Sequence, residues 1–339
     1  MNIRINKQDN TPFYKQICTQ IRSQVRSGVL LPGQMLPSLN QMAILLGISR
    51  ETVKKSYNQL LRERILIAQQ GKGVFVAGAR SSGIMEVLLI VDRQSVSNQI
   101  MMQSFQQALE DDAHITILLH SQNLDVLEYY LDQNLDRYDY YVVSPHFPLD
   151  SRSQARAAKL LRRIPNRKLI MLDNWVRDVP GSYGVVYQDF RHDAYEGLKE
   201  GLRDMGRRLK VIVLPQSLYG KVILESVREF ARDFDVEVSA YNDVPVELEK
   251  GDVVLVINSQ LDSGLVLLAR RIQECGLEPG KDVRIISYNE FPLNDVVLGG
   301  LTTLSTDFPA MGQTAAGMIL TGVLRKTHNP FHMVRRRTF

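Results

Sequence analysis

The stretch 36–57, LPSLNQMAILLGISRETVKKSY, decides the fold of the N-terminal part of the chain. Its apolar residues recur at helical spacing on both sides of a break at Gly47, which predicts two short helices joined by a tight turn. Ser38 followed by Gln41 is the pattern of a capping box for the first helix, and Ser49 offers a cap for the second. The stretch therefore predicts a helix-turn-helix.

The second of these helices has two faces of different composition. Its predicted core face consists of Val53, Tyr57, Leu60 and Leu61. The first turn instead carries polar and basic side chains, and in a helix-turn-helix this end reaches base edges in the major groove of DNA. A solvated charged surface is the alternative, but the motif makes DNA the better interpretation. The DNA contacts predicted on the motif are Ser38, Asn40, Ser49, Arg50, Thr52, Lys54 and Lys55.

The segments on either side complete a small domain. Apolar residues between positions 14 and 25 recur every three or four residues, which predicts a helix. After the motif, two short β-branched runs flank Gln-Gln-Gly-Lys-Gly and predict a hairpin, the wing of a winged helix. The tip of this wing adds Gly71 and Lys72 to the predicted DNA contacts. A phosphate-binding loop is a poorer interpretation of Gly-Lys-Gly, because the length and the following helix of a P-loop are missing.

Charge is distributed unevenly along the chain, whose formal net charge is +4. Residues 1–79 contain eleven Lys and Arg against three Asp and Glu, a net charge of +8 that leaves −4 for the remainder. A positive module on a mildly acidic body is expected when only the module meets a phosphate backbone.

Residues 11–77 resemble the winged-helix domain of the GntR family of bacterial transcription regulators. The likeness lies in P-x-Y-x-Q-I, S-G-x-L-x-P-G, L-P-S, G-I-S-R-x-T-V and Q-G-x-G-x-F-V at the family's spacing. It carries the family's DNA contacts over to Arg50, Thr52, Lys54 and Gly71. Two positions depart from the family: Asn40 stands where Arg is usual, and Glu51 where Thr is usual. Both departures change the expected operator, because an acidic group favours cytosine amino groups and repels phosphate.

A small, polar segment at 78–84 is the predicted linker between the domain 1–77 and a body at 85–339. In the body, short apolar runs alternate with helical patterns, which predicts an α/β fold with parallel sheets buried on both faces. The runs are 87–91, 115–119, 140–143, 169–172, 211–214, 253–257 and 283–287. The body is long for one sheet, so we expect two doubly wound lobes with a ligand cleft at the carboxyl ends of the strands.

The body resembles the effector domain of the LacI family, which is built like a periplasmic sugar-binding protein. The likeness lies in KLIMLDN at 168–174, GRRLKVI at 206–212, VVLVIN at 253–258, GKDVRIISYNE at 280–290 and LTT at 301–303. It implies one lobe of about 85–180 with 304–325, and a second of about 181–303 with 326–339. A GntR head on such a body is the arrangement of the arabinose-repressor type, which makes sugar the first ligand class to consider.

Carried over by position, the predicted ligand contacts are Ser97, Asn98, Asp173, Trp175, Asp189, Lys221, Asn258 and Asn289. The family has Asp where Asn289 stands, and its ligand-gripping Arg falls on Ile223. Without that Arg a phosphorylated ligand is disfavoured, and we expect a neutral pentose or deoxyhexose such as arabinose or fucose. Simple packing is the alternative for Trp175, and helix capping is the alternative for Asp173 and Asp189.

Other classes of protein find less support in the sequence. No nucleophile elbow, zinc-protease motif, dinucleotide fingerprint or Walker lysine is present, so an enzyme acting on a small polar metabolite is the alternative rather than the prediction. A DNA-binding architectural protein without a ligand is a third hypothesis. The six His residues show no close ligand spacing, so neither a metal nor a cofactor is expected.

Compartment and assembly complete the prediction. No apolar run approaches the length of a membrane span, the N-terminus has no signal-peptide core, and two distant Cys residues suggest free thiols. We therefore expect a cytoplasmic protein, and the two family resemblances imply a sugar-responsive regulator, a repressor relieved by its ligand. It would bind an inverted-repeat operator as a homodimer, because two heads related by a twofold axis contact two half-sites.

Overall fold

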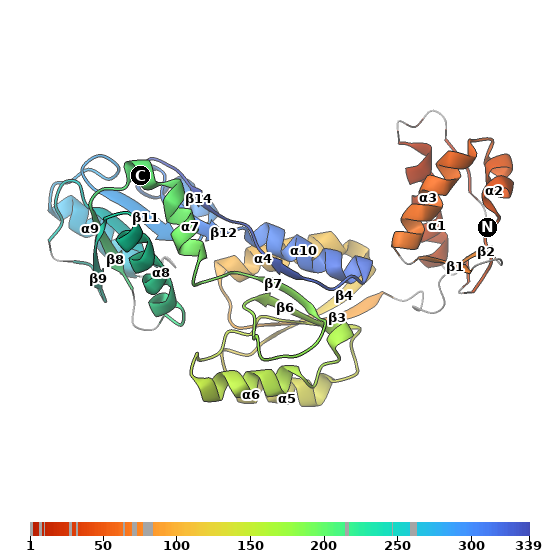
Figure 1. The fold of residues 1–339 in the computed structure, drawn as a ribbon, viewed down its shortest axis with the longest axis horizontal. Coiled ribbons are helices and arrows are strands. Elements are labelled where there is room, and N and C mark those ends of the chain that lie inside the picture. Colours follow the sequence, from red (N-terminus) through yellow and green to blue (C-terminus); the bar gives the residue numbers. More distant parts are fainter. Residues whose placement is uncertain are drawn as a thin grey trace. The chain divides into compact units, whose positions relative to one another are not determined.

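The computed structural model describes residues 3–6, 9, 11–26, 29–31, 33–63, 65–69, 73–76, 84–213, 217–245, 247–257 and 263–339. Within these ranges the chain forms a small N-terminal domain and a larger α/β body that contains two sheets (Figure 1). The predicted linker lies outside the described residues except for Ile84. None of the helices in these ranges is long and apolar enough to cross a membrane.

The N-terminal domain is a winged helix. Its helices are α1 (Phe13–Arg26), α2 (Leu39–Leu46) and α3 (Arg50–Arg62), and its hairpin is β1 (Leu66–Gln69) with β2 (Gly73–Val76). The two strands pair antiparallel, and a bridge between Met35 and Phe75 adds a third chain segment to the hairpin. The predicted helix-turn-helix and wing are therefore confirmed.

The turn between α2 and α3 follows from local chemistry. Ser38 Oγ accepts from the backbone N–H of Gln41, and the Gln41 side chain accepts from the backbone N–H of Ser38, so both halves of the capping box form. Gly47 ends α2 at a φ of 61°, where a side chain would be strained. Ser49 Oγ accepts from the backbone N–H of Thr52 at 3.2 Å and starts α3.

One apolar core joins the three helices to the wing. The α3 residues in this core are Val53, Tyr57 and Leu60, with Leu61 partly buried. The Tyr57 hydroxyl donates to the Pro37 carbonyl at 2.8 Å, which ties α3 to the segment before α2. Cys18 is buried in the same core and Cys275 is exposed in the body, and both are free thiols as predicted. Burial raises the pKa of the Cys18 thiol to about 11.

The first sheet of the body has the strand order β13-β7-β6-β5-β3-β4. Its strands are β3 (Met85–Val91), β4 (Ala113–Leu119), β5 (Tyr140–Val143), β6 (Leu169–Asp173), β7 (Gly184–Tyr187) and β13 (Lys326–His328). The pairs from β13 through β3 are parallel. Helices α5 (Leu124–Asn134) and α6 (Ser151–Leu161) cover one face. Helix α10 (Phe308–Thr321) packs against α4 (Val96–Leu109), where Gly312 leaves room for the α4 backbone.

The second sheet has the order β14-β12-β11-β10-β8-β9. Its strands are β8 (Arg208–Ile212), β9 (Glu237–Tyr241), β10 (Val253–Val256), β11 (Arg284–Tyr288), β12 (Thr302–Thr306) and β14 (Phe331–Val334). Only β14 pairs antiparallel with its neighbour among the described pairs. Helices α7 (Asp193–Glu200) and α8 (Gly220–Asp233) pack on one face, and α9 (Ser263–Glu274) packs on the other.

Sheet membership differs from the lobe boundaries that the sequence predicted. Strand β7 lies in the first sheet, although the predicted boundaries put 181–303 in the second lobe. Strand β13 also lies in the first sheet, although the predicted boundaries put 326–339 in the second lobe. Strand β12 joins the second sheet as a whole, although the predicted boundary at 304 divides it. The chain thus crosses between the sheets at 188–192, near 307 and at 329–330. An apolar pattern identifies a strand but not the sheet edge that it joins.

Candidate functional site

The first turn of α3 presents side chains that were predicted to contact DNA. Arg50 and Lys54 are exposed there, and Lys54 Nζ lies 3.8 Å from Glu51 Oε1. Thr52 Oγ1 and Ser49 Oγ share a hydrogen bond of 2.8 Å at the start of the helix. The backbone N–H groups and dipole of a helix N-terminus also favour a phosphate at this end. The exposed basic start of α3 is the candidate nucleic-acid interface.

The remaining predicted DNA contacts differ in their exposure and in the elements that they face. Ser38 and Asn40 are exposed at the start of α2. Lys55 Nζ lies 4.0 Å from the centre of the Tyr14 ring, so its ammonium is placed over α1. Gly71 and Lys72 lie outside the described residues.

In the body, Asp173 is the centre of a hydrogen-bonded group at the carboxyl end of β6. Its φ of 66° is left-handed, a conformation that is uncommon for a residue with a side chain and that often marks a functional site. Its Oδ2 lies 2.9 Å from His146 Nε2, and its Oδ1 accepts from the Gln188 amide. Both carboxylate oxygens therefore have protein partners, and neither caps a helix.

His146 connects this group to the second lobe. Because a carboxylate only accepts, Nε2–H of His146 donates to Asp173, and Nδ1 lies 3.0 Å from the Tyr219 hydroxyl. Tyr219 immediately precedes α8, so the bond joins the two lobes of the body. Burial lowers the pKa of His146, but the hydrogen bond and charge of Asp173 outweigh burial and leave that pKa above its ordinary value.

A pocket of about 350 Å³ opens beside this group. Four aromatic side chains contribute to its walls: Trp175, Tyr187, Phe190 and Tyr219. The Phe190 and Tyr219 rings stack with centroids 4.0 Å apart. Gln188 also lines the pocket and is 6% exposed, and its Oε1 has no hydrogen-bond partner among the described residues. Aromatic walls around a few buried polar atoms are typical of sites for small polar molecules.

Trp175 is both packed and open to the pocket. Its Nε1 donates to the Tyr183 hydroxyl at 3.1 Å, and its ring lies 5.2 Å from that of Tyr187. Arg177 and Lys326 place cationic groups 4.4 Å and 4.8 Å from the indole centre. The packing alternative therefore describes part of its environment, and stacking of a ligand on its ring stays a prediction.

The structure brings some of the predicted ligand contacts together and not others. Trp175 and Asp189 line the pocket, and Asp173 lies behind Gln188 without lining it. Asp189 Oδ1 also accepts from the backbone N–H of Arg191 at 3.2 Å. This bond lies in the turn before α7, so it resembles the helix cap that was the alternative role for Asp189. Asn289 is left-handed at the end of β11, with a φ of 77°, and does not line the pocket. Asn258 lies outside the described residues.

Four other positions also lie away from the pocket lining. Lys221 is exposed, and Ile223 is buried in the core of the second lobe. Ser97 Oγ bonds to Ser95 Oγ at 3.0 Å. Asn98 donates to Asp92 Oδ1 at 2.9 Å at the carboxyl end of β3. Burial alone would raise the pKa of Asp92, but His146 and the Asn98 hydrogen bond bring that pKa below its ordinary value.

Sequence reasoning missed His146, Gln188, Phe190 and Tyr219. A signal existed for two of them, because His146 and Gln188 follow the apolar runs that form β5 and β7. Polar residues at the carboxyl ends of parallel strands are candidates for binding. Phe190 and Tyr219 carry no such signal, since their position depends on how the chain crosses between the sheets.

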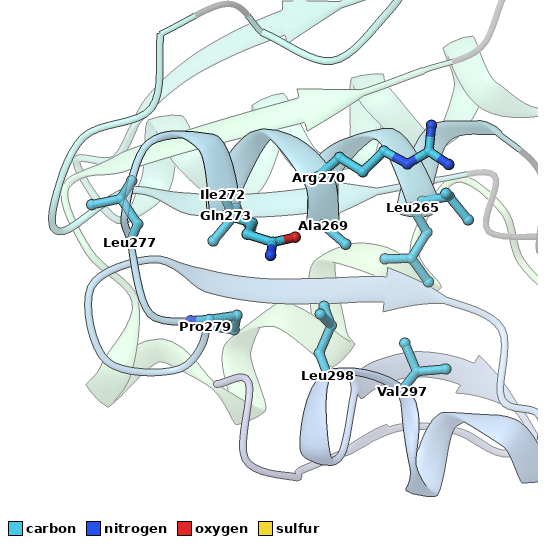
Figure 2. Close-up of a pocket in the computed structure, with 10 residues that line it drawn as sticks. Leu265, Ala269, Arg270, Ile272, Gln273, Leu277, Pro279, Val297 and Leu298 are labelled. Atoms are coloured by element: carbon cyan, nitrogen blue, oxygen red, sulfur yellow. The ribbon is translucent and has the colours of Figure 1, made fainter.

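A second, larger pocket of about 480 Å³ lies between α9 and the segment at 297–298 (Figure 2). Its labelled side chains are mainly aliphatic, including Leu265, Leu277 and Leu298, with Arg270 at one end (Figure 2). It offers few polar groups to orient a sugar. The smaller pocket beside Gln188 is therefore the better candidate for a polar ligand.

Residues 13–76 match the family model described as "Bacterial regulatory proteins, gntR family". The N-terminal domain is a GntR-family winged helix. The HTH-type transcriptional repressor NagR of Bacillus subtilis (strain 168) is 40% identical to the chain over 75 residues, which are 22% of this chain and 31% of that protein. The chain thus spans about a third of that relative, through the GntR domain. The match is to a transcription regulator and not to an enzyme, as predicted.

Solved structures resemble the body of the protein. A dimeric Lac repressor aligns with a TM-score of 0.59 and 15% identity, over 74% of this chain and 98% of that one. A periplasmic binding protein/LacI transcriptional regulator from Alkaliphilus metalliredigens QYMF, complexed with D-xylulofuranose, aligns with a TM-score of 0.55 and 15% identity, over 75% of this chain and 98% of that one. At this identity the likeness establishes the fold, an α/β body of the kind predicted.

Proposed function

We propose that the chain is a transcription regulator of the cytoplasm that binds operator DNA through its GntR domain and a small sugar through the pocket beside Gln188. The observation that carries the proposal is the combination of an exposed basic recognition helix with an aromatic-walled pocket that is lined by Gln188, whose Oε1 is buried without a partner among the described residues. Hydroxyl groups suit such polar atoms, and sugar rings stack on aromatic faces.

The finer assignment follows the sequence prediction. The chain acts as a homodimer on an inverted repeat, represses transcription, and releases DNA when a pentose or deoxyhexose such as arabinose or fucose binds. The dimeric Lac repressor and the sugar-bound regulator from Alkaliphilus support this assignment by analogy of fold.

The test is a thermal-shift screen of the full chain against pentoses, hexoses and deoxyhexoses. A ligand that binds only the native state raises the melting temperature, and the rise grows with the logarithm of the ratio of ligand concentration to dissociation constant. Selection of bound sequences from random duplex DNA then gives the operator. A chain that selects no sequence contradicts the regulator, whereas a chain that selects an operator but is stabilised by no sugar contradicts only the ligand class.

A further inference from the structure

Gln188 is held in an orientation that leaves one polar atom without a partner. Its amide nitrogen donates to Asp173 Oδ1, which fixes the plane of the amide. Its Oε1 is buried, with no hydrogen-bond partner among the described residues, and the residue lines the pocket. Asp173 itself is not part of the pocket lining.

An unpaired buried acceptor is unfavourable in the free protein. Leaving such a group without a donor costs free energy comparable to that of a lost hydrogen bond, so native structures retain few of them. A ligand that supplies a donor recovers this cost, whereas an analogue without the donor does not. A buried acceptor of this kind thus favours ligands that carry a hydroxyl group at the matching position.

We propose that Gln188 selects the ligand of the pocket: Oε1 accepts a hydrogen bond from a hydroxyl of the bound sugar. Asp173 is then a positioning residue, which orients the Gln188 amide and does not contact the sugar. This inference rests on the proposed function, because it assigns a role within the same pocket.

Calorimetry on the full chain tests the assignment with L-arabinose, L-fucose and the sugars found in the thermal-shift screen, together with monodeoxy analogues of each binder. Gln188→Met keeps the length of the side chain and removes the acceptor. It is expected to weaken binding of the parent sugar about tenfold. One monodeoxy analogue should bind wild type and Gln188→Met equally. Gln107→Met, the same exchange on an exposed position of α4, serves as the control and should leave affinity unchanged.

A double-mutant cycle separates the role of Asp173 from that of Gln188. If Asp173 acts through Gln188, Asp173→Ala with Gln188→Met should bind the parent sugar no more weakly than Gln188→Met alone. Equal affinity of wild type and Gln188→Met for every sugar that binds overturns the inference and leaves the proposed function intact. A wild-type protein that binds no sugar of the panel overturns the inference together with the sugar assignment of the proposed function.

Discussion

At the scale of single residues, Asp173 and Trp175 could be placed at the end of a parallel strand because they follow the apolar run 169–172. Their role as ligand contacts was implied by the resemblance to the LacI family and stays a prediction. The contacts of His146 could not be predicted from the sequence in the same way. Its partners Asp173 and Tyr219 lie 27 and 73 residues away in sequence, so no local spacing reveals the group. The role of Gln188 depends on an unpaired atom, which only three-dimensional structure identifies.

The hydrogen bond between His146 and Asp173 predicts a pH-dependent contribution to stability. Because the folded-state pKa of His146 is raised, this contribution is full below the unfolded pKa of about 6.5 and is lost as pH rises through the folded pKa. The difference in free energy of unfolding between wild type and His146→Gln should therefore narrow from pH 6 to pH 9 in urea titrations. His192→Gln, at an exposed position, is the control. A difference that widens with pH would contradict the assignment.

Arg50 is predicted to contribute most to sequence discrimination by α3. Arg50→Ala should lower the free energy of discrimination between operator and random DNA by about 1–3 kcal/mol, the value of a bidentate base contact. Fluorescence anisotropy with labelled duplexes measures both affinities. Arg62→Ala, at the other end of the same helix, should keep the ratio. An unchanged ratio in Arg50→Ala would show that another residue reads the operator.

At the scale of elements, each of the seven predicted apolar runs overlaps a strand, but β12 was not among them and could not be recognised from hydrophobicity. Its sequence TTLST is mostly polar, yet all five residues are buried. Partners distant in sequence satisfy its polar groups: the Thr302 hydroxyl donates to the Arg336 carbonyl at 3.1 Å, and the Thr338 hydroxyl accepts from Thr302 N–H at 2.8 Å. A pattern based on hydrophobicity therefore describes this strand as a loop.

The segments that cross between the sheets are joined through Asn329, which is 1% exposed. Its amide donates to Thr306 Oγ1 at 2.7 Å and to the Asp307 carbonyl at 2.8 Å, and its backbone N–H donates to the Tyr187 carbonyl. Nearby, His328 Nε2 lies 2.7 Å from Asp193 Oδ1. These bonds connect the three places where the chain crosses between the sheets.

Asn329→Ala is expected to lower the free energy of unfolding by about 2 kcal/mol, because two buried hydrogen bonds of about 1 kcal/mol each are lost. Urea titration monitored by circular dichroism measures this change. Asn134→Ala, which removes one amide bond of 2.8 Å at a partly buried position on α5, is the control and should cost less than about 1 kcal/mol. Equal losses in the two variants would argue against a special role for the crossing segments.

At the scale of the whole molecule, the uneven charge predicts how DNA binding depends on salt. The positive charge of the chain is concentrated in residues 1–79, with a net charge of +8 from eleven basic and three acidic residues. Each phosphate neutralised by a basic residue makes the slope of log affinity against log salt more negative by about 0.9. Affinity for operator should therefore fall steeply with salt, and a slope near zero would contradict binding through the basic domain.

The central claim is that the body pocket controls the DNA-binding domain. A ligand shifts DNA affinity only if it binds the DNA-competent and DNA-incompetent states unequally, and such coupling typically amounts to a factor of about 5–150. The most direct measurement is anisotropy titration of labelled operator with the full chain, with and without a saturating concentration of the sugar that stabilises it. We expect the sugar to weaken operator binding at least fivefold. The same dissociation constant with and without sugar would contradict it.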